Sequence, residues 1–192
     1  QNTGAFADSE SAGDWTRVAA CNVVQGSDGD PKQQALWTIE SSLVNQPGNL
    51  AEFFRPRARQ LILVVSNEDD CSAGGSFDWG SASEEASIRT RCAKNAAAFR
   101  DIEAWGRTVS AQARTVEGIA LAVLSGPPAD QSLDGDQNLR PACQSALGAA
   151  YPANRLWQAT RYFGPQGVFE SLCTDDLSFN LTAIADALAK PA

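Results

Sequence analysis

The sequence contains no histidine and no methionine among its 192 residues. The absence of histidine excludes Ser-His-Asp and Cys-His hydrolases, HExxH metalloproteases and most catalytic zinc sites. Any catalysis by this chain would therefore depend on carboxylates, Lys, Tyr, Ser or Cys. The sequence begins at Gln1 without a charged or apolar leader segment, so we expect it to be a mature or processed piece of a protein.

Long apolar runs and an excess of basic residues are also absent. The longest apolar runs, at residues 61–65 and 119–124, have the length of strands, so no membrane span is expected. The 15 basic and 23 acidic residues give a net charge of −8. Because a nucleic-acid-binding protein normally carries a basic patch, no nucleic-acid partner is expected. The hydrophobic fraction of 43% can fill the core of one domain.

The five cysteines predict two local disulfides. Cys71 and Cys92 bracket a loop rich in Gly and Ser, and Cys143 and Cys173 bracket the last irregular segment. Disulfides persist in oxidising compartments, so these pairings predict an extracellular, cell-surface or periplasmic protein. Cys21 is then either a buried thiol or the partner of a cysteine outside this chain. The alternative is a cytosolic protein with five reduced, buried thiols.

Alternating apolar runs and amphipathic segments predict an α/β fold. Two runs, residues 61–66 and 117–125, are almost wholly apolar, which is typical of strands buried on both faces of a parallel sheet. We expect a mostly parallel sheet with helices on both faces, formed by a single domain at residues 18–192 after a polar lead-in at residues 1–17. Further strands are expected at residues 18–24 and 168–173. One helix is expected to begin at residue 31, a second to run from residue 84 to about 112 with a break near Asn95 or Gly106, a third to span residues 155–163, and a last one to begin at residue 175.

Two acidic loops follow strands of the expected sheet, at the edge where open α/β proteins bind ligands. Clustered oxygen ligands suit Mg²⁺ or Ca²⁺. The alternative is that these side chains are turn and helix-cap residues on a solvated rim. The candidate metal ligands are Asp30 after the first strand, and Asn67, Asp69 and Asp70 after the strand at 61–66.

The Gly/Ser-rich loop that follows the second acidic loop carries two aromatic residues, Phe77 and Trp79. Exposed aromatic side chains in such a loop could contact a partner. The alternative is that they fold back on the core as a lid.

Three successive stretches, GDPKQQALWTIESSL, NLAEFFRPRARQLILVVS and NEDDCS, lie between residues 29 and 72. They resemble the later part of a von Willebrand factor A (VWA) domain, and most closely the VWA-like domains of bacterial secreted and surface proteins. The downstream stretches CQSALGAA, PANRLW and SLCTDDLSFNLTAIADAL also fit the end of such a domain. The resemblance covers roughly residues 25–190. It implies a VWA-type α/β sheet, of which this chain holds the later two-thirds and lacks the N-terminal strand and helix.

By this resemblance, VWA domains bind a divalent cation through a D-x-S-x-S loop, a Thr and an Asp at the carboxyl edge of the sheet. This chain has no D-x-S-x-S motif; the Thr position falls on or near Asp30 and the Asp position on Asn67. The resemblance therefore implies a degenerate site that binds Ca²⁺ or Mg²⁺ weakly or not at all, and no cofactor is certain.

The expected function is a non-enzymatic adhesion or assembly module that binds a protein partner at the acidic edge, with Glu68, Phe77 and Trp79 as candidate partner contacts. The alternative is a secreted hydrolase that acts on glycans with carboxylates alone, pairing Asp69 with Asp30. Such chemistry needs two carboxyl groups about 5–9.5 Å apart across a cleft. Because strands buried on both faces need neighbours, we also expect an upstream segment or a second chain to complete the sheet.

Overall fold

The computed structural model describes residues 30–45, 60–73, 77–80, 84–113, 118–146 and 148–189. The chain divides into two compact units, Gln1–Asp30 and Pro31–Ala192, and every helix and strand given below belongs to the second. Three features expected from the sequence lie outside the described residues. They are the strand at residues 18–24, Cys21, and the boundary between the lead-in and the domain at residues 17 and 18. Within the described ranges, no helix has the length and apolar character that a membrane span needs.

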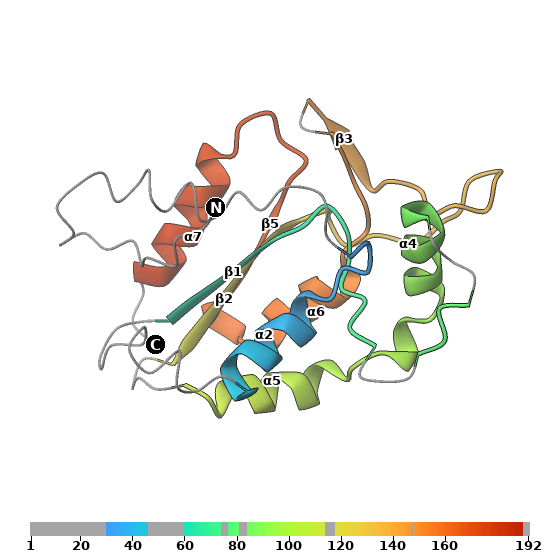
Figure 1. Ribbon diagram of the computed structural model, residues 1–192. Coiled ribbons are helices and arrows are strands. Elements are labelled where there is room, and N and C mark those ends of the chain that lie inside the picture. Colours follow the sequence, from blue (N-terminus) through green and yellow to red (C-terminus); the bar gives the residue numbers. More distant parts are fainter. Residues whose placement is uncertain are drawn as a thin grey trace, which may run out of the picture. The chain divides into compact units, whose positions relative to one another are not determined.

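Helices alternate with strands along the described part of the second unit (Figure 1). The helix expected from residue 84 to about 112 breaks at Asn95, one of the two positions expected, and restarts as a second helix whose N-cap is Asp101. Gly106, the other position, lies inside that second helix. In chain order the elements are α2 (Ala35–Asn45), β1 (Gln60–Val65), α4 (Glu85–Lys94), a 3₁₀ turn (Ala96–Ala98), α5 (Ile102–Ser110), β2 (Ile119–Ser125), β3 (Cys143–Ser145), β4 (Gly148–Ala150), α6 (Asn154–Tyr162), a second 3₁₀ turn (Gly164–Gln166), β5 (Gly167–Ser171) and α7 (Ser178–Ala189).

Three of the strands form a parallel sheet in the order β1–β2–β5 (Figure 1). Parallel neighbours need crossover connections, and here α4 and α5 connect β1 to β2, while the β3–β4 hairpin and α6 connect β2 to β5. The carboxyl ends of all three strands therefore meet at one edge of the sheet. The mixed α/β architecture with a parallel sheet agrees with the expectation from the sequence, and among the described residues this sheet is small.

The main core lies on one face of the sheet, against α2, α5 and α6. Alternate residues of β2, such as Leu121 and Val123, point to this face, where Trp105 of α5 and Leu156 of α6 are fully buried. The indole nitrogen of Trp105 donates to the carbonyl oxygen of Leu36 at 2.8 Å, so the one polar atom of this large side chain is satisfied inside the core. Each buried Leu or Val contributes about 1.5–3 kcal/mol to this packing.

Helix α7 covers only part of the opposite face (Figure 1). There, Leu124 of β2 packs against Ile184 of α7, so β2 is buried on both faces as predicted. The same prediction is wrong for β1. Its residues Leu61, Leu63 and Val65 point to the α7 face but remain 41%, 45% and 58% exposed, because α7 contacts β2 and β5 and does not extend over β1.

Candidate functional site

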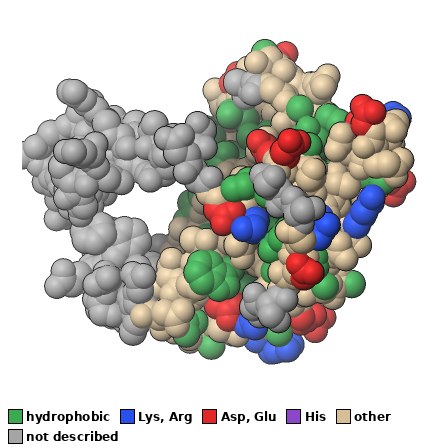
Figure 2. Space-filling model, turned by 45° about the vertical axis from the view of Figure 1, so that its right-hand side comes forward, with side chains coloured by type: hydrophobic (Ala, Val, Ile, Leu, Met, Phe, Trp, Pro, Cys, Tyr) green, Lys and Arg blue, Asp and Glu red, His purple; other side chains and the backbone are tan. Residues whose placement is uncertain are grey.

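The acidic loop at residues 67–70 follows β1 at the carboxyl edge of the sheet. Asn67 is exposed, whereas Glu68, Asp69 and Asp70 are buried. Elsewhere on the surface, acidic and basic side chains lie interspersed, as on the face drawn in Figure 2. Buried carboxylates are costly unless they are paired or hydrogen-bonded. Asp70 contacts α2 and α6, Asp69 contacts α6, and Glu68 contacts α4.

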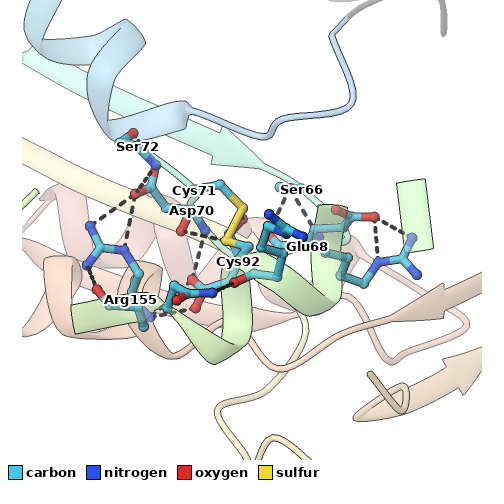
Figure 3. Close-up of a disulfide and its surroundings, with 12 residues drawn as sticks. Ser66, Glu68, Asp70, Cys71, Ser72, Cys92 and Arg155 are labelled. Atoms are coloured by element: carbon cyan, nitrogen blue, oxygen red, sulfur yellow. Dashed lines mark hydrogen bonds and ion pairs between the residues drawn. A yellow bond between two sulfur atoms is a disulfide. The ribbon is translucent and has the colours of Figure 1, made fainter. Parts of the chain in front are cut away.

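Asp70 connects α2 to α6. Its Oδ1 accepts the backbone N–H of Leu36 at 2.9 Å and the hydroxyl of Ser72 at 2.6 Å, which caps the N-terminus of α2. Its Oδ2 accepts the backbone N–H of Ser72 at 3.1 Å and two guanidinium nitrogens of Arg155, each at 3.3 Å (Figure 3). The guanidinium of Arg155 also donates to the carbonyl oxygen of Arg100 at 2.7 Å. Both carboxylate oxygens of Asp70 are therefore fully used inside the protein.

Asp69 caps the N-terminus of α6. Both of its oxygens accept the backbone N–H of Arg155 at 3.0 Å, and Oδ1 also accepts that of Leu156 at 3.1 Å. A carboxylate at this position satisfies orphan helix donors and faces the positive end of the helix dipole. Burial raises the pKa of Asp69 to about 6, although the backbone donors of Arg155 and Leu156 act to lower it. Asp69 therefore serves as a helix cap.

Glu68 pairs with Arg89 of α4. Its Oε1 accepts from the guanidinium Nε of Arg89 at 2.7 Å, and the same guanidinium lies 3.6 Å from the ring centroid of Tyr151. The other oxygen, Oε2, is buried without a hydrogen-bond partner. Burial raises the pKa of Glu68 to about 7, and the hydrogen bond and charge of Arg89 act in the opposite direction. At 1% exposure, the side chain has no surface to offer a partner.

Both cysteine pairings predicted from the sequence lie at disulfide distance. Cys71 and Cys92 have a Cα–Cα separation of 5.6 Å and connect the acidic loop to α4 (Figure 3). Cys143 and Cys173 have a Cα–Cα separation of 5.9 Å and connect β3 to the segment after β5. Since the bonds close loops of 21 and 30 residues, each stabilises the fold by about 3–4 kcal/mol in the chain-entropy model.

The two aromatic residues of the Gly/Ser-rich loop fold back on the first disulfide. Phe77 makes edge-to-face contacts with Trp79 and Phe99, with ring centroids 4.8 Å and 5.0 Å apart. All three rings pack around Cys71 and Cys92, and Phe77 and Trp79 are partly buried. These rings therefore form a lid over the disulfide, which is the second of the two roles that the sequence left open.

The candidate metal ligands are Asp30 in the first unit and Asn67, Asp69 and Asp70 in the second. Within the described ranges, no group of three or more His, Cys, Asp or Glu side chains is placed to hold a metal ion. Asp69 and Asp70 use their oxygens as helix caps, Asn67 is exposed, and Asp30 is an exposed residue of the first unit. A weak Ca²⁺ or Mg²⁺ site that includes these four residues stays a prediction.

A groove of about 820 Å³ opens next to this edge, between α6, the first turn of α5 and the 3₁₀ turn at Ala96–Ala98. Asp69 of the acidic loop contributes to its lining. The sequence does not mark the α6 residues of the groove as functional, since a mixed polar and aromatic stripe on a short helix resembles any solvated helix face. They follow the i, i+3, i+4, i+7, i+8 spacing of one helix face, and are Asn154, Trp157, Gln158, Arg161 and Tyr162.

Comparison of the chain with protein-family models, with curated proteins and with solved structures finds no match. The resemblance to VWA domains therefore stays a prediction that depends on the motifs between residues 25 and 190. The function has to be argued from the geometry of the chain itself.

Proposed function

We propose that this chain is a non-enzymatic adhesion or assembly module of the VWA type, that it acts outside the cytoplasm, and that it binds a protein partner along β1. The observation that carries the proposal is the apolar face of β1, which α7 leaves uncovered. The proposal keeps the class of function expected from the sequence. It moves the partner contact from the acidic loop to the neighbouring edge strand.

Strand β1 combines two features of an interaction surface. Among the described strands it pairs on one side only, with β2, and an edge strand offers N–H and C=O groups to a further strand. Leu61, Leu63 and Val65 form a row of exposed apolar side chains on the same strand, and contiguous apolar patches on protein surfaces mark interaction sites. A partner protein that supplies a β-strand with apolar side chains would satisfy both features.

The arrangement of the acidic loop supports a non-catalytic module. A glycan hydrolase that works with carboxylates alone needs two of them facing a shared cleft, with one able to donate a proton and the other to act as base or nucleophile. Asp69 caps α6, Asp70 caps α2 and Glu68 pairs with Arg89. These contacts make the loop a structural junction between helices, so the hydrolase alternative with Asp69 and Asp30 is less well supported.

The location and the fold type are supported by coarser features. Two disulfides suit an oxidising compartment such as the extracellular space or the periplasm. The parallel order β1–β2–β5, with α7 on one face and α2, α5 and α6 on the other, suits the later strands of a VWA-type sheet.

Site-specific photo-cross-linking tests the proposed surface. A benzoylphenylalanine probe at position 63, on the exposed face of β1, is compared with the same probe at position 144, since Gln144 is an exposed residue of β3. Each purified protein is irradiated with the extracellular fraction of the source organism, and cross-linked peptides are identified by mass spectrometry. We expect one discrete cross-linked protein from position 63 and none from position 144. Equal cross-linking at both positions, cross-linking only to a second copy of this chain, or no cross-link at position 63 would contradict the proposal.

A further inference from the structure

The groove next to α6 presents two aromatic rings to solvent. Trp157 and Tyr162 line it and are 38% and 37% exposed, so each ring keeps part of its surface accessible while the rest is packed. Flat aromatic surfaces with a few fixed polar groups are the usual lining of a small-molecule site. The C–H faces of a sugar ring stack on such surfaces.

The ring of Tyr162 is held in place by close packing, and the ring of Trp157 lies near an exposed arginine. Tyr162 lies so close to α5 that a Cβ added to Gly106 would approach its ring carbon Cδ1 to 2.4 Å, and the ring also makes an edge contact with Phe163 at 5.4 Å. The guanidinium of Arg161 lies 5.8 Å from the ring centroid of Trp157. A ring that is already fixed, as that of Tyr162 is, loses little conformational entropy when a ligand binds, which favours affinity.

The polar side chains around the rings include hydrogen-bond donors and acceptors of both charges. The amides of Gln131 and Gln158, the guanidinium of Arg161 and the carboxylates of Asp101 and Glu103 all line the groove. Sugar hydroxyls both donate and accept hydrogen bonds, so they suit a mixed lining of this kind. The whole lining has three arginines, Arg100, Arg155 and Arg161, and three carboxylates, Asp69, Asp101 and Glu103. An anionic ligand such as a nucleic acid or a phosphate would need an excess of basic groups.

The position of the groove also disfavours a peptide that binds as an added β-strand. A peptide that binds by strand addition needs the edge of a sheet, whereas this groove is bounded by α6, α5 and a 3₁₀ turn. Two of the groove carboxylates hold helix ends: Asp69 accepts from α6, and Asp101 accepts the backbone N–H of Ala104 at 2.7 Å. The groove is therefore better suited to bind a sugar than to cleave one.

We infer that the groove lined by Trp157 and Tyr162 is a binding site for a neutral oligosaccharide. This inference is independent of the partner surface on β1, because the groove lies on α6 and α5 and includes no residue of β1. A module with both surfaces could hold a partner protein and a glycan at the same time.

Titration of the full chain with chitotriose and with maltotriose tests the inference, with tryptophan emission and saturation-transfer NMR as readouts. We expect at least one trisaccharide to bind, and Trp157→Ala to weaken that binding about tenfold, equivalent to about 1.4 kcal/mol. Trp157→Phe, which keeps an aromatic ring, should retain most of the affinity. Trp37→Ala is the matched control, since Trp37 is an exposed tryptophan on α2 outside this groove.

Two results would overturn the inference. One is the absence of a saturation-transfer signal with either sugar at about 10 mM, a concentration that detects dissociation constants in the millimolar range. The other is equal binding by the wild type and by Trp157→Ala. A circular-dichroism spectrum of each variant confirms that it is folded, and the partly exposed position of Trp157 makes that the expected result.

Discussion

Replacing Asp70 by Asn tests whether the acidic loop is a structural junction. The side chain of Asp70 is fully buried, and its ion-pair partner Arg155 is only 8% exposed. The Asn side chain keeps an oxygen that can still accept from Leu36, so the cap of α2 is largely retained. The charge that neutralises the buried guanidinium is lost. Breaking a buried ion pair at one partner typically costs about 3–5 kcal/mol, so Asp70→Asn should lower the free energy of unfolding by that amount.

Urea unfolding followed by circular dichroism measures this loss directly. With an m-value of about 2 kcal/mol/M, a loss of 3–5 kcal/mol moves the unfolding midpoint down by roughly 2 M, and m itself should not change. The matched experiment is the double-mutant cycle with Arg155→Met. Because the double variant leaves no unpaired buried charge, its destabilisation should be smaller than the sum of the two single effects by at least about 1 kcal/mol.

Two results would refute this reasoning. A loss below about 1 kcal/mol for Asp70→Asn, which is the size of an ordinary hydrogen bond, would show that the charge of Asp70 does not stabilise Arg155. Strict additivity in the cycle would show that the two side chains act independently, although Oδ2 and the guanidinium nitrogens are 3.3 Å apart.

Two further predictions concern Glu68 and Leu63. The pKa of Glu68 is raised from 4.5 to about 7 in the folded state, so its contribution to stability is fully present below pH 4.5 and is lost as the pH rises through 7. A shift of this size corresponds to roughly 3 kcal/mol of unfolding free energy. Glu68→Gln should therefore reduce the change in unfolding free energy, measured with urea between about pH 4.5 and 8, by that amount. An unchanged pH profile would show that other groups cause the pH dependence. Leu63→Lys should change the free energy of unfolding by less than about 0.5 kcal/mol and weaken binding of the proposed partner protein in a pull-down, because lysine on an edge strand discourages strand pairing. The matched variant Leu181→Lys changes an exposed leucine of α7, and an equal effect of both would mean that β1 has no special role.

The local pattern of residues determined much of this fold. The apolar runs placed β1 and β2, the periodic leucines placed α2 and α7, and Asn95 was one of the two positions expected to break the helix between α4 and α5. These features depend on neighbours within one or two turns or strand repeats, and such neighbours are visible in the sequence. The cysteine spacing predicted both disulfides for the same reason, since each bond closes a short loop.

Only the tertiary structure decided what the acidic loop does. The sequence placed Asp69 and Asp70 after a strand and left open whether they bind a metal or cap helices. The answer depends on backbone N–H groups that are 34 residues away at Leu36 and 87 residues away at Leu156. Packing likewise decided that β1 keeps one apolar face exposed, since an apolar run is the same whether or not a helix covers it. The groove on α6 arises in the same way, from the close approach of α5 at Gly106, because a cleft between helices is a property of their packing and has no local signature in either helix.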